Sequence, residues 1–203
     1  MDKIIYFDEF NEITEKEYKE LYSFLPKSRK EQIDKINDKK TIKIKIIEYH
    51  LIKRYLKLKS NIDFCYSKSG KPYIENAKHF SISHTKNALV IVISNDNVGI
   101  DMEKIKGHKA GLIKKVCNEK EIQEIKNSKN KQKKFLEIWT KKESAVKLLD
   151  KSVFFDTKDI LTNLKDVKFK TFLRNNHIIT IAKTNKNFIK WQNYILKNKR
   201  CVV

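Results

Sequence analysis

Apolar and polar positions alternate along this chain with two different periods. Four segments have the three-to-four-residue apolar spacing of amphipathic helices: 15–25, 42–58, 109–127 and 131–150. A further, highly charged helix is expected after Pro26. Thr14 followed by Glu17 predicts a capping box at the start of the first helix. The run IKIKI at 42–46 also fits a strand, so the beginning of that helix stays open.

Shorter segments have the two-residue period, or the continuous apolar run, that is typical of β-strands. They are 3–10, 79–84, 87–94, 98–103, 166–173, 177–183 and 188–196. The turn residues at 95–97 predict that 87–94 and 98–103 form an antiparallel hairpin. Helices followed by strands, twice in succession, predict an α/β (α+β) fold of two α/β halves packed together. We place the division between residues 1–105 and 106–203.

Composition narrows the class of protein. The chain has 203 residues, 40% of them hydrophobic, and no apolar run long enough to cross a membrane. The N-terminus lacks the apolar stretch of a signal peptide. Three widely spaced cysteines suit a reducing compartment, so a cytoplasmic protein is expected. The net charge of +20 favours an acidic partner or ligand, although a solvated lysine-rich face explains it equally well.

The stretch NVGIDMEKIK places Asp101 and Glu103 two positions apart, directly after a glycine. On a strand both carboxylates face the same side, and Gly99 allows another element to approach the backbone closely. Two adjacent carboxylates repel each other unless a cation lies between them, and oxygen ligands favour Mg²⁺. The alternative is an exposed strand edge where the acids pair with Lys104 and Lys106.

Two further motifs carry candidate chemistry. In FLEIWTKKESAVKLL, Glu143 and Lys147 are four residues apart on one helix face, which also fits an ordinary surface ion pair. In FSISHT, Ser83 and His84 end a strand, where they either contact a phosphate or serve the structure. They are not a catalytic pair, because neighbouring strand residues point to opposite faces. Lys71 follows the glycine of a turn, SGKP.

Taken in order, these motifs resemble the 4′-phosphopantetheinyl transferase family. GKPY, FSISHT, VGID with an acid two residues on, and WTKKESAVK are similar to the signature of that family. Asp101 and Glu143 are 42 positions apart, within the spacing that the family uses. The length is similar to the surfactin-synthetase-activating type, a monomer built as an intramolecular pseudo-dimer of two similar halves.

The resemblance implies a role for each matching residue. Asp101, Glu103 and Glu143 would hold Mg²⁺ against the diphosphate of coenzyme A, and Lys147 would neutralise the same phosphates. Glu143 would be the base, directly or through a water. Lys71, Ser83, His84, Arg29 and Lys43 would contact the nucleotide. Ser28, Glu31 and Ile44 depart from the family's pattern, which leaves the N-terminal contacts open.

The resemblance also implies the reaction and its partners. A serine hydroxyl of an apo acyl or peptidyl carrier protein would attack the β-phosphate, and adenosine 3′,5′-bisphosphate would leave. Carrier proteins are acidic, which gives the basic surface a use. Two other functions remain as alternatives: a basic nucleic-acid-binding protein, which the sequence favours less because it has no recognised nucleic-acid motif, and a Mg²⁺-dependent nuclease or phosphatase.

Overall fold

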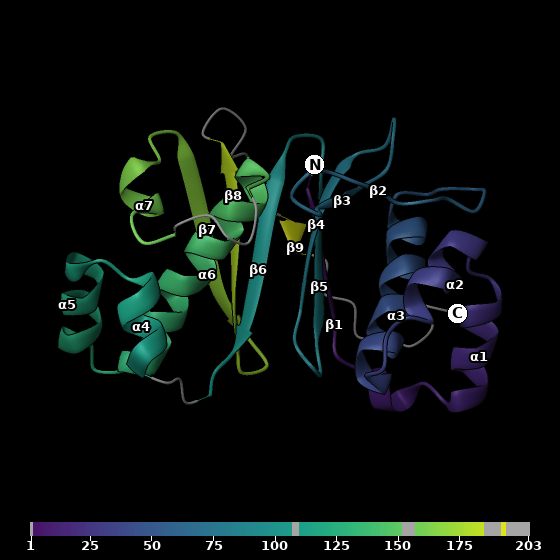
Figure 1. The fold of residues 1–203 in the computed structure, drawn as a ribbon, viewed down its shortest axis with the longest axis horizontal. Helices are drawn as coiled ribbons and strands as arrows, with labels where there is room; N and C mark the ends of the chain where they lie inside the picture. Colours follow the sequence, from purple (N-terminus) through teal and green to yellow (C-terminus); the bar gives the residue numbers. More distant parts are fainter. Residues whose placement is uncertain (1, 107–109, 152–156, 185–191, 194–203) are drawn as a thin grey trace.

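The structure is a computed structural model that describes residues 2–106, 110–151, 157–184 and 192–193. Figure 1 shows two groups of helices on either side of centrally placed strands. The described helices are η1 (Phe10–Glu12), α1 (Glu15–Ser23), α2 (Lys27–Ile33), α3 (Lys39–Tyr55), α4 (Ala110–Val116), α5 (Glu119–Asn127), α6 (Lys131–Leu149) and α7 (Ile160–Asn163). The described strands are β1 (Lys3–Phe7), β2 (Cys65–Tyr66), β3 (Pro72–Tyr73), β4 (His79–His84), β5 (Leu89–Ser94), β6 (Val98–Lys104), β7 (Val167–Arg174), β8 (His177–Thr184) and β9 (Gln192–Asn193).

The first sheet has the strand order β4-β5-β1-β9, and α1, α2 and α3 lie beside it (Figure 1). β5 is buried along its whole length, because it is central in the sheet and covered on both faces. α3 contributes Ile44, Ile47 and Leu51 to the core beneath the sheet. The IKIKI run is therefore helical, and the predicted capping box of Thr14 and Glu17 is present at the start of α1.

The second sheet has the order β6-β8-β7, with every pair antiparallel. α6 packs across β6 and β8, and a Cβ atom added to Gly99 of β6 would lie 1.9 Å from the carbonyl oxygen of Ser144. The absence of a side chain at Gly99 thus sets how closely α6 approaches the sheet, as the sequence predicted. Within the described residues the mixed α/β class is confirmed.

A buried lysine joins α6 to its neighbours. The side chain of Lys142 is fully buried, and its ammonium group lies 2.7 Å from the Glu121 carboxylate of α5. It also donates to the carbonyl oxygens of Val116, Thr157 and Lys158, at 2.9, 2.9 and 2.6 Å. One cation therefore holds the end of α4, the start of α5 and the segment before α7 against α6.

The predicted hairpin of 87–94 with 98–103 is wrong. β5 is flanked on both sides by β4 and β1, so it has no free edge for β6, and β6 pairs with β8 instead. The turn at 95–97 carries the chain from one sheet to the other. The predicted helix over 109–127 is two helices, because Asn118 forms a new capping box with Glu121 that begins α5.

Serine hydroxyls join the two sheets where β4 meets β6. The backbone N–H groups of Ile100 and Met102 donate to the hydroxyl oxygens of Ser81 and Ser83, each at 3.1 Å. These two bonds take the place of a backbone ladder along this seam.

Two further observations limit what the fold is. No helix among the described residues is long and apolar enough to span a membrane. Cys65 and Cys117 are free thiols.

Candidate functional site

The candidate site lies between β6 and α6, where Asp101 faces Lys147. The Asp101 carboxylate is buried, and Glu103 lies two positions later on the same face of β6. Its Oδ1 accepts a hydrogen bond from the Lys147 ammonium at 2.8 Å and from the Ser83 hydroxyl at 3.0 Å. Lys147 also donates to the carbonyl oxygen of Ile82 at 3.3 Å. Two sheets and one helix therefore fix this carboxylate.

The other oxygen of Asp101 has capacity left for a ligand. Oδ2 is buried and has no hydrogen-bond partner among the described residues. A buried carboxylate oxygen without a partner is costly, and a bound cation or a phosphate-linked water would relieve that cost. Glu103, on the same face of β6, accepts a hydrogen bond of 3.4 Å from the Trp139 indole. The donor set is hard oxygen, which suits Mg²⁺.

Glu143 lies on α6, one helical turn before Lys147. Burial, together with the negative charges of Asp101 and Glu103, raises the pKa of Glu143 to about 7, although the Lys147 cation partly opposes this rise. This pattern is typical of carboxylates crowded around a place where positive charge is needed. Among the described residues, no three His, Cys, Asp or Glu side chains are grouped closely enough to hold a metal ion, so Asp101, Glu103 and Glu143 do not form a ready-made ligand set. A divalent ion here would need substrate oxygens or waters to complete its coordination.

The surface ion pair considered for Glu143 and Lys147 is not the pairing observed. Among the described residues, Lys147 pairs with Asp101 across the helix–strand interface. The alternative considered for the strand acids, an exposed edge paired with Lys104 and Lys106, does not hold for Asp101, which is buried and pairs with Lys147. The structure therefore brings three predicted site residues, Asp101, Glu143 and Lys147, into one electrostatic group.

Ser83 and His84 occupy opposite faces of β4, as expected for neighbouring strand residues. Ser83 is buried, where it donates to Asp101 and accepts from the Met102 N–H, so its oxygen orients the acid. His84 is exposed because it is the last residue of β4, although Phe80 and Ile82 on the same face pack against the core. Partial desolvation and the ammonium groups of Lys45 and Lys147 lower the pKa of His84. The imidazole is therefore mostly neutral at pH 7 and can accept or donate a hydrogen bond.

Lys71 lies at the end of the turn between β2 and β3, near the start of β6. Its ammonium group donates to the Asn97 side-chain oxygen at 2.8 Å and to the carbonyl oxygen of Val98 at 3.1 Å. Burial and the nearby Lys147 cation lower the pKa of Lys71 to about 8, although the Asp150 carboxylate opposes this fall. An anion bound beside Lys71 and Lys147 would favour the charged form of both lysines.

Two predicted contacts lie elsewhere. Arg29 of α2 is buried, and its guanidinium donates to Glu48 at 2.8 Å, so a structural ion pair already satisfies part of it. Lys43 of α3 pairs with Glu15 and lies 4.5 Å from the centre of the Tyr18 ring.

The lysine of α3 near His84 is Lys45, which the sequence analysis missed. Lys45 pairs with Glu48 at 2.8 Å and is one of the cations that lower the pKa of His84. Residues two apart on a helix differ by about 200° in direction, so Lys43 and Lys45 cannot share one face. The signal for Lys45 was its spacing of three from Glu48.

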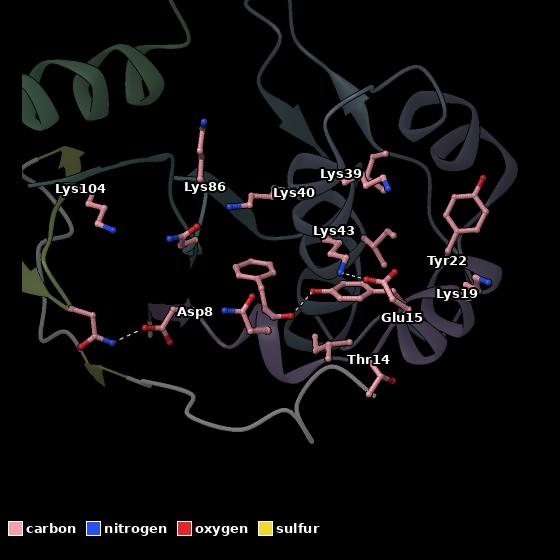
Figure 2. Close-up of a pocket in the computed structure, with 18 of the residues that line it drawn as sticks. Asp8, Thr14, Glu15, Lys19, Tyr22, Lys39, Lys40, Lys43, Lys86 and Lys104 are labelled. Atoms are coloured by element: carbon pink, nitrogen blue, oxygen red, sulfur yellow. Dashed lines mark hydrogen bonds and ion pairs between the residues drawn. The ribbon is translucent and has the colours of Figure 1, made fainter. Parts of the chain in front are cut away.

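A large cavity lies beside this group rather than within it. Figure 2 shows it between α1, the first half of α3 and the ends of β4 and β6. Its volume is about 1150 Å³. None of the three acids Asp101, Glu103 and Glu143 lines it. Six of its described lining residues are lysines: Lys19, Lys39, Lys40, Lys43, Lys86 and Lys104. Two of these lysines, Lys86 and Lys104, lie at or just after the ends of β4 and β6, the strands that carry His84 and Glu103.

Comparison with known proteins decides the family. Residues 97–197, about half of the chain, match the model of the 4′-phosphopantetheinyl transferase superfamily. The chain belongs to this superfamily. The matched segment contains Asp101, Glu103, Glu143 and Lys147, whereas the hairpin that carries Lys71 and the β4 strand that carries Ser83 and His84 precede it.

Individual relatives agree with that assignment. The chain is 34% identical over 96 residues to a 4′-phosphopantetheinyl transferase gsp of Aneurinibacillus migulanus, a match that covers 46% of this chain and 40% of the relative. It is 26% identical over 144 residues to the 4′-phosphopantetheinyl transferase Sfp of Bacillus subtilis strain 168, covering 66% of this chain and 64% of the relative. A second Bacillus subtilis transferase is 29% identical over 111 residues, 53% of this chain and 50% of the relative. The chain thus spans about half the length of the curated relatives it matches.

Proposed function

We propose that this protein transfers the 4′-phosphopantetheine arm of coenzyme A to a serine of an apo carrier protein. The observation that carries the proposal is the Asp101–Lys147 contact at 2.8 Å with Glu143 beside it, inside the segment that matches the superfamily. The names of the relatives support the reaction class. The protein would act as a monomer of two pseudo-symmetric halves in the cytoplasm, of the surfactin-synthetase-activating type.

The residues of the chain would divide the reaction between them. Glu143, whose pKa is about 7, is poised to accept the proton of the attacking serine hydroxyl, directly or through a water. The serine oxygen forms a bond to the β-phosphorus, and the bond from that phosphorus to the bridging oxygen breaks. Lys147 would compensate the negative charge that grows on the departing adenosine 3′,5′-bisphosphate, and Lys71 would bind the nucleotide.

The proposed site would also hold a divalent cation. Asp101, Glu103 and Glu143 would hold Mg²⁺, which when bound neutralises the diphosphate oxygens of coenzyme A. The unpartnered Oδ2 of Asp101 and the crowding that raises the pKa of Glu143 both support a cation between these side chains. Ser83 and Lys147 keep Oδ1 of Asp101 occupied, so Oδ2 is the oxygen left for the metal.

The nucleotide would lie toward β4 and the β2–β3 turn. His84, together with Lys45, offers contacts for a phosphate group at the exposed end of β4. Arg29 is a weaker candidate because its guanidinium is buried against Glu48. Lys43 is a weaker candidate because it lies beside Glu15 and Tyr18.

The acidic carrier protein would dock on the lysine-lined cavity. The cavity combines a basic rim with an apolar floor that includes Phe10, Ile42 and Ile46, which suits an acidic amphipathic helix. Lys86 and Lys104 in its lining are close in sequence to His84 of β4 and Glu103 of β6, so a carrier seated there would lie at one end of the strands that carry the candidate site. Lysines also attract nucleic acid, which is the second candidate for this surface.

The test is a mass measurement. Purified apo acyl and apo peptidyl carrier proteins are incubated with the protein, coenzyme A and Mg²⁺, and the intact mass of each carrier is recorded. A gain of one phosphopantetheine arm, lost with Asp101→Asn and with excess chelator, is expected. Release of inorganic phosphate from coenzyme A without any carrier, or no gain with either carrier class, would contradict the proposal.

A further inference from the structure

The residue that follows α6 has an unusual backbone conformation. Asp150 follows Leu149 with φ 53° and ψ 45°, the left-handed region, and its N–H donates to the carbonyl oxygen of Val146. Glycine is the usual residue at this position after a helix, because a side chain there is strained. An aspartate in place of glycine at this position therefore suggests that its carboxylate makes a contact that glycine could not make.

That contact reaches across to the β2–β3 turn. Oδ1 of Asp150 accepts hydrogen bonds from the hydroxyl groups of Ser67, at 2.7 Å, and Ser69. These partners lie 83 and 81 positions earlier in the chain. Hydrogen bonds from Ser69 and Ser67 hold the pKa of Asp150 below its usual range in spite of partial desolvation, so it is ionised at neutral pH.

The same serine continues the connection to Lys71. The N–H of Lys71 donates to the Ser67 hydroxyl oxygen at 3.2 Å, and the Ser67 N–H donates to the Lys71 carbonyl oxygen at 3.0 Å. Gly70, with φ 85°, closes this tight turn. The carboxylate of Asp150, the hydroxyl of Ser67 and the backbone of Lys71 are therefore consecutive members of one hydrogen-bonded chain.

A second connection returns from Lys71 to the same end of α6. The Lys71 ammonium donates to the Asn97 side-chain oxygen, and the Asn97 side-chain nitrogen donates to the carbonyl oxygen of Leu148 at 2.6 Å. The loop from α6 through Asp150, Ser67, Lys71 and Asn97 back to α6 is thus closed. Because Glu143 and Lys147 belong to α6, the loop fixes Lys71 relative to both.

We propose that Asp150 is a positioning residue for the nucleotide end of coenzyme A: it ties the β2–β3 turn to α6 and thereby places Lys71 beside Lys147. This inference rests on the proposed function, in which coenzyme A binds between these elements. Asp150 acts through Ser67 and the turn, and its own contacts with substrate are not required.

The test compares substitutions on both sides of the tie. Asp150→Gly removes the carboxylate and relieves the backbone, and Ser67→Ala with Ser69→Ala removes the donors. Each should raise KM for coenzyme A on the order of tenfold, the usual effect of losing a charge-assisted hydrogen bond, with kcat within about twofold of wild type. Combining all three substitutions should raise KM no further, because each breaks the same tie.

Two variants control for structural effects. Lys57→Gly relieves the left-handed residue that follows α3, where φ is 58°, and should leave KM for coenzyme A unchanged. Asp150→Asn keeps an oxygen acceptor and tolerates this backbone, so its KM should lie within about threefold of wild type.

The outcomes separate this inference from the proposed function. Calorimetric titration of each protein with coenzyme A and Mg²⁺ is read beside the KM values. Wild-type protein that binds no coenzyme A would overturn both. Wild-type protein that binds and transfers, with Asp150→Gly equal to it in KM and affinity, would overturn the tie alone. Additive effects of Asp150→Gly and the serine substitutions would also overturn it.

Discussion

Lys142 and Lys147 lie five residues apart on α6 and have opposite surroundings. Lys142 is fully buried, and a carboxylate and three carbonyl oxygens surround its ammonium group. The Lys147 ammonium is part-exposed and contacts Asp101 and one carbonyl oxygen, while the second oxygen of Asp101 has no hydrogen-bond partner in the part of the chain that the structure describes. Both are lysine–carboxylate pairs of 2.7–2.8 Å between α6 and a neighbouring element.

The contrast between these two lysines shows how a structural ion pair differs from one that is available for chemistry. Around Lys142 every donor has an oxygen to meet, so there is nothing left for a ligand to satisfy. Around Lys147 the hydrogen bonding is incomplete, and a neighbouring carboxyl, Glu143, has its pKa raised to about 7. Incomplete pairing in a charged, half-buried group marks the place where a substrate or ion belongs.

The largest effect should come from exchanging Glu143 for Gln. This change keeps the shape and removes the base, so kcat should fall by about 10²–10⁴ with little change in the free energy of unfolding. Stopped-time mass analysis of the carrier protein measures it. Glu121→Gln, which alters the partner of Lys142, is the matched control and should lower stability rather than kcat.

The double variant Glu143→Lys with Lys147→Glu sharpens the same test. A simple surface pair would survive the exchange with a loss of less than about 1 kcal/mol and normal turnover. We expect an inactive protein, because Lys147 faces Asp101 rather than Glu143. Near wild-type turnover would remove Glu143 from the site.

Replacing each lysine with Met should reverse the order of effects between stability and activity. Lys142→Met leaves Glu121 without its cation and should destabilise the fold by about 3–5 kcal/mol, as expected for one partner of a buried pair. Lys147→Met should cost less stability, because its side chain is 29% exposed, but should lower kcat. Urea unfolding monitored by circular dichroism gives the free energies. An equal loss of unfolding free energy in both variants would contradict the distinction between a structural Lys142 and a site residue Lys147.

A smaller effect concerns pH and thermal stability in the presence of a chelator. The folded-state pKa of Glu143, about 7, lies above the usual value of 4.5, so folding favours the protonated carboxyl. The resulting stabilisation is present below pH 4.5 and is lost as pH rises through 7. Glu143→Gln removes this dependence, so its Tm should exceed that of wild type by a few degrees at pH 8 and by less at pH 5. A Tm difference that does not change with pH would contradict it.

The smallest effect is expected at the lysine-lined cavity. Lys39→Glu with Lys40→Glu should raise KM for an acidic carrier protein several-fold at low salt, while KM for coenzyme A stays the same. The difference should shrink as salt screens the exposed charges. Lys114→Glu with Lys115→Glu on α4 reverses the same number of charges on another helix and serves as the matched control. A larger rise in KM for the carrier protein with the α4 variant would indicate that the carrier docks on α4 instead.

Local signals in the sequence predicted most elements, and long-range pairing accounts for the errors. The Thr14–Glu17 capping box and the shared face of Asp101 and Glu103 depend on residues two or three apart, and both are present. The hairpin failed because the partner of β6 is β8, about 80 residues later, and a turn signal carries no information about that competition. The tail prediction at 188–196 falls mostly outside the described residues, where only β9 is described, paired with β1.

The residues of the candidate site were likewise predicted where they depend on local spacing and missed where they depend on long-range contacts. Asp101, Glu143 and Lys147 were found from motif spacing, and the structure brings them together. Lys43 was chosen over Lys45 because the sequence does not state which helix face meets β4. The role of Ser83 in orienting Asp101 depends on a seam between two sheets, which no spacing along one strand can reveal.

That seam between β4 and β6 also covers two sheet edges. β4 and β6 are both edge strands of their sheets, and exposed edges are templates for pairing with other chains. Here each edge covers the other, joined by the hydroxyls of Ser81 and Ser83 instead of a ladder. Splitting the polypeptide at residue 96 would therefore produce two fragments that each carry an unpaired edge, and both would be prone to aggregate.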